Sequence, residues 1–172
     1  LENLSDFLVY PSIASDEFSI EGASAVFVGY GVHAPAYDYD DYADVDVKGK
    51  VVVYFSGAPD IFDNESRAHY TSSRLKRKEA SERGAIGMIG LRSRRYDEYV
   101  PWERIKAQAG ARPGMAWVTL TGEPADYYPE LLGSASISTE VAHELFAGLP
   151  CSSGQRCHLL TRINNPNRST LT

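Results

Sequence analysis

The chain has 172 residues, with 17 lysines and arginines against 23 aspartates and glutamates, and 43% of its residues are hydrophobic. This length and composition are typical of one globular domain with its own core, and they exclude a disordered chain. The net charge of −6 is not that of a general nucleic-acid-binding protein, so no nucleic acid partner is expected. The longest apolar run, at positions 85–91, is far shorter than the ~20 residues of a membrane-spanning helix, so no membrane span is expected.

The charges are unevenly distributed. Residues 74–95 hold eight basic and two acidic side chains, and residues 37–65 hold eight acidic and two basic ones. We interpret these stretches as solvated surfaces that neutralise each other across the fold, in preference to a patch for nucleic acid or for an acidic partner.

The first predicted elements are two strands. Residues 25–32 and 50–56 are rich in β-branched and aromatic side chains and are bounded by glycine, proline and aspartate, a pattern typical of sheet strands. The segment between them carries Pro35 and alternates tyrosine with aspartate. It is too polar and too often interrupted for a helix, so it is predicted to be a long loop.

A helix and a buried strand are predicted next. Helix-forming residues dominate positions 71–83, with Ser72 or Ser73 available as N-cap and Gly84 just beyond the end. The apolar run at 85–91 has the length of a buried strand.

The second half of the chain has weaker signals. Residues 92–114 contain two prolines and no sustained periodicity, which predicts mostly loop with a turn of helix around 103–109. Short strands are predicted at 116–120 and 135–138, and a second helix from residue 138 or 139 to Gly148. Short strands with two helices placed late indicate an α+β fold.

No complete catalytic or metal-binding motif is visible. His143 and Glu144 form the first half of a zinc-protease helix, but position 147 is alanine where the second histidine would stand. The chain also has no Gly-x-Ser-x-Gly elbow for a serine nucleophile. Cys151 and Cys157 enclose a short loop, and both a disulfide and two free thiols remain open for them.

Several short motifs follow one another in a distinctive order. Gly29-Tyr30-Gly31 ends the first predicted strand, Asp40-Asp41-Tyr42 lies in the loop, and positions 46–52 read Asp-Val-Lys-Gly-Lys-Val-Val. A lysine-rich helix at 76–82 and the sequence Gly-Ala-Ile-Gly at 84–87 come next. This series resembles the protease-associated domain found within secreted dizinc aminopeptidases, the group that includes glutamate carboxypeptidase. Residues 112–117 and 135–148 are similar to the closing strand and helix of that domain.

The resemblance implies a compact β/β/α swivelling domain at residues 25–150, with a lead-in segment at 1–24 and a connecting segment at 151–172. It also implies a secreted or periplasmic protein, whose catalytic domain lies elsewhere in the same polypeptide and holds two zinc ions. The His-x-Asp, Glu-Glu and further ligands that such a site requires do not occur in this chain. We therefore expect it to hold no cofactor and to be inactive alone.

The hypothesis from the sequence is a non-catalytic accessory domain of an exported zinc aminopeptidase, which shapes substrate access or packs on the catalytic domain. Its partners would be that catalytic domain and the peptide substrate. The alternative is a free-standing or receptor-type interaction module without a peptidase in cis. Candidate contact residues are aromatic or basic and lie in irregular segments: Tyr37, Tyr39, Tyr42, Arg92, Arg94, Arg95 and Trp102.

Overall fold

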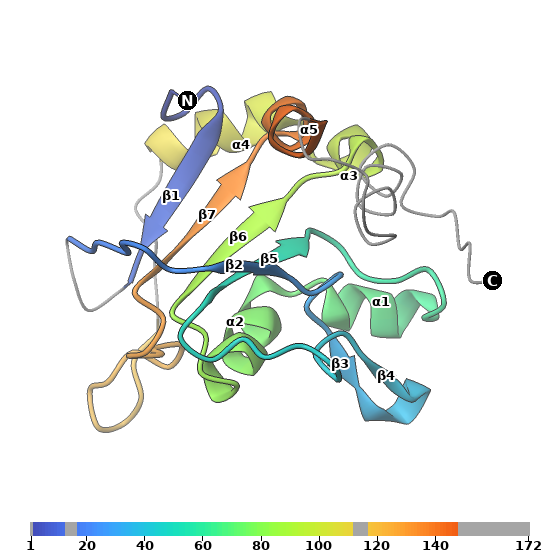
Figure 1. Cartoon of the computed structure of the whole chain (residues 1–172), viewed down its shortest axis with the longest axis vertical. Coiled ribbons are helices and arrows are strands. Elements are labelled where there is room, and N and C mark those ends of the chain that lie inside the picture. Colours follow the sequence, from blue (N-terminus) through green and yellow to red (C-terminus); the bar gives the residue numbers. More distant parts are fainter. Residues whose placement is uncertain (1, 13–16, 112–116, 148–172) are drawn as a thin grey trace.

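A mixed five-stranded sheet forms the centre of the protein (Figure 1). The computed structural model describes residues 2–12, 17–111 and 117–147. The strand order across the sheet is β1 (Phe7–Pro11), β7 (Gly133–Ile137), β6 (Gly87–Leu91), β5 (Val51–Phe55) and β2 (Ala25–Phe27). All neighbouring strands are parallel except β1, which runs antiparallel to β7 at one edge.

A small two-stranded sheet lies outside the main one. It pairs β3 (His33–Ala34) with β4 (Tyr39–Asp40) in antiparallel fashion, and a short 3-10 helix (Pro35–Tyr37) connects them. This hairpin occupies part of the segment predicted to be a loop.

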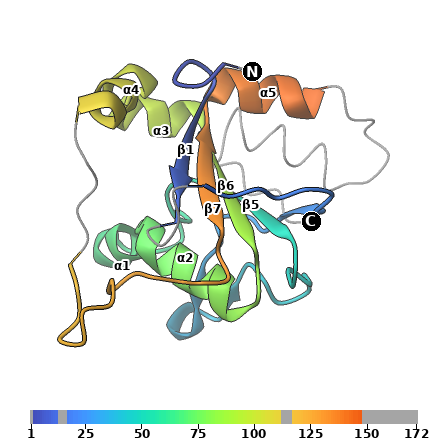
Figure 2. The same ribbon diagram turned by 90° about the vertical axis from the view of Figure 1, so that its left-hand side faces the viewer.

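Helices connect the parallel strands. The crossover from β5 to β6 contains α1 (Asn64–Tyr70) and α2 (Ser73–Glu82), and the crossover from β6 to β7 contains α3 (Arg94–Tyr99) and α4 (Trp102–Ala111). The last described helix, α5 (Thr139–Ala147), follows β7. Figure 2 shows α2 and α5 on opposite sides of the sheet.

Two hydrophobic clusters hold these layers together, because successive side chains of a strand point to opposite faces. On the α2 side, Val52 and Met88 pack with Ala80. On the α5 side, Phe55 and Leu91 belong to a cluster with Val141 of α5. The two central strands are therefore buried on both faces, which explains their nearly continuous apolar sequences.

The predicted α+β class is confirmed, as are the strands expected at 50–56, 85–91 and 135–138 and the helices expected at 71–83 and 138–148. The strand expected at 25–32 is confirmed only for its first residues. The backbone leaves the extended conformation at Gly29 and Gly31, where φ is +66° and +65°. Glycine adopts this left-handed region at little cost, so the motif forms a turn.

The expectation of two helices is wrong, since the described residues form five α-helices. Residues 92–114 were predicted to be mostly loop with a turn of helix around 103–109. That turn is confirmed as part of α4, whereas α3 was not predicted. The Ser93 hydroxyl accepts the Tyr96 N–H at 3.2 Å at the start of α3, and Pro101 directly precedes α4. Both residues are helix-start signals, but the many charged residues of this segment obscure its periodicity.

Two further elements were not predicted. The helix α1 has no apolar stripe, but the Asp63 carboxylate caps it by accepting the Ser66 N–H at 2.9 Å. The strand β1 lies within the segment interpreted as a lead-in and completes one edge of the sheet.

The strand predicted at 116–120 is wrong for its described part, residues 117–120. These residues are exposed, and Val118 forms only an isolated bridge with Pro124. In the part of the chain that the structure describes, no helix is long and apolar enough to span a membrane.

Replacing Phe55 with alanine should lower the free energy of unfolding by about 3–5 kcal/mol, the usual cost of truncating a buried aromatic ring. Phe55 is fully buried, and its ring meets Phe27 edge-on at 5.3 Å between centroids. Ile61→Ala is the control, because Ile61 is 66% exposed and its truncation should change stability by less than about 0.5 kcal/mol. Urea denaturation measures both, and equal effects would contradict the described core.

Candidate functional site

A crevice of about 550 Å³ opens where β5 and β6 end. Ser56 and Gly57 follow β5 directly, and Ser93 follows β6 by two residues. Ligands of sheets with parallel strands usually bind at the carboxyl ends of those strands, so this position is a reasonable one for a functional site. The crevice is also lined by Tyr30, Asp60, Arg67, Arg95, Tyr96 and Tyr99.

One carboxylate joins two arginines within the crevice. Asp60, in the loop after β5, lies 3.2 Å from Arg67 of α1 and 2.8 Å from Arg95 of α3, one oxygen to each guanidinium. Two positive charges thus share one negative charge. All three side chains are about one-third exposed, so this group meets solvent and has an excess of positive charge.

The same pairing brings the two oppositely charged stretches of the sequence together. Asp60 belongs to the acidic stretch and Arg95 to the basic one, and Arg83 and Asp40 form a second pair between these stretches at 3.0 Å. These contacts agree with the interpretation that the two stretches neutralise each other.

Asp41 fixes the Gly-Tyr-Gly turn after β2, which lies beside the crevice. Its Oδ2 accepts the backbone N–H groups of Tyr30 and Val32 at 2.9 and 3.1 Å, and its Oδ1 accepts the Tyr39 hydroxyl at 2.7 Å. Burial raises the pKa of Asp41, while the Tyr39 hydroxyl, these N–H groups and the charge of Lys76 act in the opposite direction. The Gly-Tyr-Gly turn thus depends on a carboxylate eleven residues further along the chain.

Lys76 fixes the backbone on the other side of this turn. It lies on the buried face of α2, together with Ala80 one helical turn later. Its ammonium donates to the carbonyls of Tyr30, Phe55 and Gly57 at 2.6, 3.3 and 2.5 Å. One side chain therefore ties the turn after β2 to the end of β5.

Arg83 attaches the Asp-Asp-Tyr motif to the end of α2. Its guanidinium lies 2.7 Å from Glu79, 3.0 Å from Asp40 and 4.7 Å from the centre of the Tyr42 ring. Tyr42 is buried, and burial is the main reason why its pKa is raised. Asp40, Asp41 and Tyr42 thus serve the scaffold.

The other two tyrosines of the predicted contact set also pack on their own domain. The Tyr37 hydroxyl bonds to Asp63 and, at 2.7 Å, to Ser66, both at the start of α1. The rings of Tyr37 and Tyr39 lie 4.6 and 5.5 Å from that of Phe62. With Tyr42 buried, none of the three presents a fully exposed ring.

The four basic and aromatic candidates of residues 92–102 have different environments. Arg92 is buried, bonds to Asp97 at 2.6 Å and lies between the rings of Tyr96 and Trp102. Trp102 donates its indole N–H to the Ser5 carbonyl at 2.6 Å. Arg94 is exposed outside the crevice lining, and Arg95 lies in it. The structure thus places Arg95 with the crevice and gives Arg92 and Trp102 internal partners.

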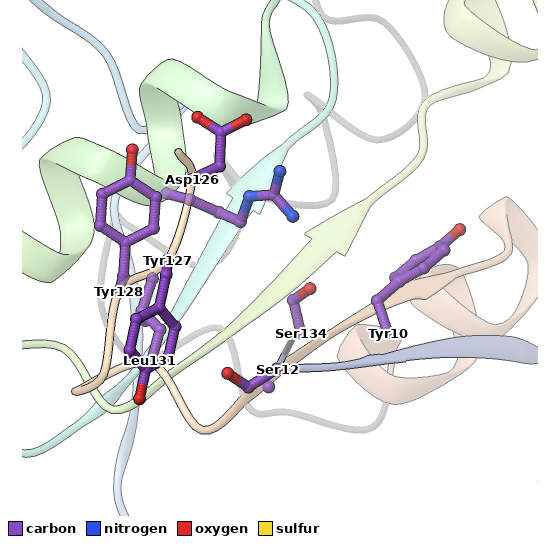
Figure 3. A pocket seen from close by; sticks show the side chains of 9 residues that line it. Tyr10, Ser12, Asp126, Tyr127, Tyr128, Leu131 and Ser134 are labelled. Carbon is purple, nitrogen blue, oxygen red and sulfur yellow. The ribbon is translucent and has the colours of Figure 1, made fainter. Parts of the chain in front are cut away.

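A second, much smaller pocket of about 40 Å³ lies between α2 and the opposite end of β7 (Figure 3). Tyr10, Tyr127 and Tyr128 line it together with Arg77, whose Nε is buried without a hydrogen-bond partner among the described residues. Nearby Asp126 pairs with Arg74 at 2.8 Å.

Metal-ligating residues are not grouped within the described ranges: no three His, Cys, Asp or Glu side chains lie close enough together there to hold a metal ion. Cys151 and Cys157 lie outside the described residues.

The sequence did not point to Asp60, Arg67, Tyr99 or Lys76 as site residues. The first three come from three segments that meet only because β5 and β6 are adjacent and parallel. Lys76 could have been noticed by its spacing, since it lies four residues before the small residue Ala80. Its place in a run of basic residues suggested an exposed surface instead.

No protein-family model matches the chain, and no curated protein matches it. Among solved structures, it is similar to an aminopeptidase from Aneurinibacillus sp. strain AM-1, at 21% sequence identity and a TM-score of 0.34. The match covers 74% of this chain but 22% of that aminopeptidase. A likeness of this degree carries no argument about the function of the present chain.

Gly29→Ala should destabilise the protein more than Gly49→Ala does. Both glycines have positive φ, +66° and +68°, so each alanine carries a backbone cost of about 1–2 kcal/mol. A Cβ at Gly29 would also lie 2.3 Å from the Asp41 Oδ1, whereas none of the described atoms lies within 4 Å of one at Gly49. Because hydrogen bonds hold Asp41 in place, we expect an additional loss of about 2 kcal/mol.

Urea denaturation of the two variants gives this difference directly. Equal losses of stability would show that the Asp41 carboxylate does not hold the Gly-Tyr-Gly turn.

Proposed function

We propose that this chain is a non-catalytic accessory domain of an exported zinc aminopeptidase, and that it presents the carboxyl-edge crevice to the peptide substrate beside the catalytic domain. The two zinc ions would belong to the catalytic domain, which lies elsewhere in the same polypeptide. Secretion or export to the periplasm is part of the same proposal.

The proposal rests on the contacts that the motif residues make in the structure. Asp41 holds the Gly-Tyr-Gly turn and Lys76 holds the end of β5, and both segments line the crevice. The residues on which the family resemblance rests thus build the frame of one open crevice. A frame that presents binding groups is what an accessory domain requires.

The crevice lining suits contact with a peptide. Arg67 and Arg95 offer guanidinium donors to carboxylates and to backbone carbonyls. Tyr99, which is 70% exposed, offers an aromatic surface at low entropic cost. An extended peptide could thus receive both polar and apolar contacts from one side of the domain.

The rival hypothesis, an interaction module that binds through its tyrosine loop, has less support. Tyr37 and Tyr39 are half-buried against Phe62, and Tyr42 is buried. Tyr99 and Trp117 are the most exposed aromatic residues of the described chain, and of these two it is Tyr99 that lines the crevice.

The test is the kinetics of Arg95→Ala and Tyr99→Ala in the full-length peptidase. Each variant should raise KM several-fold and leave kcat within about twofold, because substrate contacts outside the reacting centre contribute uniform binding. Glu98→Ala is the control, since Glu98 is exposed on the same helix but does not line the crevice.

The isolated chain, supplied with zinc, should release no amino acid from the same peptides. Hydrolysis by the isolated chain, or unchanged KM in both crevice variants, would contradict the proposal.

A further inference from the structure

Lys76 is a buried cation beside the crevice rather than within it. Its side chain is 2% exposed, and buried charges are retained only where other groups replace the lost water. Three backbone carbonyls surround its ammonium, and the rings of Tyr30 and Tyr54 lie 5.8 and 5.2 Å from it. Two of these carbonyls, those of Tyr30 and Gly57, belong to residues that line the crevice.

We propose that Lys76 is a positioning residue, whose ammonium holds the Tyr30 and Gly57 segments of the crevice together and loosens them when it loses its proton. The inference rests on the proposed function, because it describes the regulation of the same crevice. It would make peptide binding depend on pH although Lys76 itself does not touch the peptide.

The number of donors explains why the proton matters. An ammonium has three N–H donors and no lone pair, whereas a neutral amine has two donors and a lone pair that repels carbonyl oxygens. Three carbonyls lie within 3.3 Å of Nζ. Deprotonation therefore leaves at least one of them without its donor, and a buried carbonyl without a donor favours rearrangement of its segment.

The charged and titratable groups around Lys76 come from several elements. Asp41, after β4, is the opposite charge that raises its pKa. Glu79, on the next turn of α2, pairs with His33 of β3 at 3.4 Å. His69 and Tyr70 of α1 line a cavity together with Lys76, His33 and Glu79.

The balance of these influences favours release of the proton near neutral pH. Burial lowers the pKa of Lys76 from 10.5 to about 7, against the opposing effect of Asp41. In the unfolded chain the lysine keeps its proton up to its ordinary pKa. Between these two values the unfolded state binds more protons, so the contribution of Lys76 to stability should rise with pH in this window.

The experiment is a titration of the isolated chain by nuclear magnetic resonance between about pH 5.5 and 9, a range that covers the lowered pKa. Labelled lysine reports the protonation of Lys76 through its ¹³Cε shift, and the backbone amides of Gly57, Ala58 and Gly31 report the crevice. We expect the Lys76 signal and these amides to change together, with a common midpoint near 7.

Two variants identify the responsible group. Lys76→Met should abolish the transition of the crevice amides, although His33 and His69 are still present. Lys78→Met should preserve the transition, because Lys78 is an exposed residue of the same helix, paired with Glu82 at 3.0 Å. If Lys76→Met does not fold, the proposal is still tested by whether the lysine and the amides titrate together in the unaltered chain.

The proposal is overturned if Lys76 stays protonated throughout this range, if the amides do not move as it titrates, or if Lys76→Met retains their transition. None of these readings requires peptide or peptidase. A crevice that binds no peptide would contradict the proposed function and leave the titration of Lys76 unaffected.

Discussion

Two charges of opposite sign, the buried Lys76 and the half-buried Asp41, hold the irregular backbone at the carboxyl edge of the sheet. Where parallel strands end, their polar backbone groups lose the pairing of the sheet and need other partners. Asp41 accepts the N–H groups of the turn after β2, and Lys76 donates to carbonyls of that turn and of β5. Each charge also stabilises the other. The shape of the crevice follows from these contacts.

This arrangement separates the scaffold from the surface. The aspartates and tyrosines of the Asp-Asp-Tyr loop, and Lys76 of the lysine-rich helix, bond to their own domain. The crevice presents Arg67 and Arg95, which share Asp60, and the exposed ring of Tyr99. We propose that this surface binds and orients peptide, as an accessory domain beside a catalytic one would.

The sequence predicted those strands and helices that have a continuous apolar run or a clear end signal. The strands β5 and β6 are buried on both faces, so their apolar runs indicated strands, and α2 ends at a glycine that is easily recognised. The helices α1 and α3 were missed because only a capping Asp63 or Ser93 indicates them. The crevice could not be predicted from spacing, since Asp60 and Arg95 lie 35 residues apart. The burial of Lys76 was not predicted, because basic residues usually lie at the surface.

The most direct test of the accessory role is the nucleotide sequence on both sides of the region that encodes Leu1 to Thr172. We predict one reading frame that continues into a segment with the His-x-Asp, Glu-Glu and final His ligands of a dizinc site, preceded by an export signal. Stop and start codons close to both ends of this region would contradict it, because no peptidase domain would then share the polypeptide with the crevice.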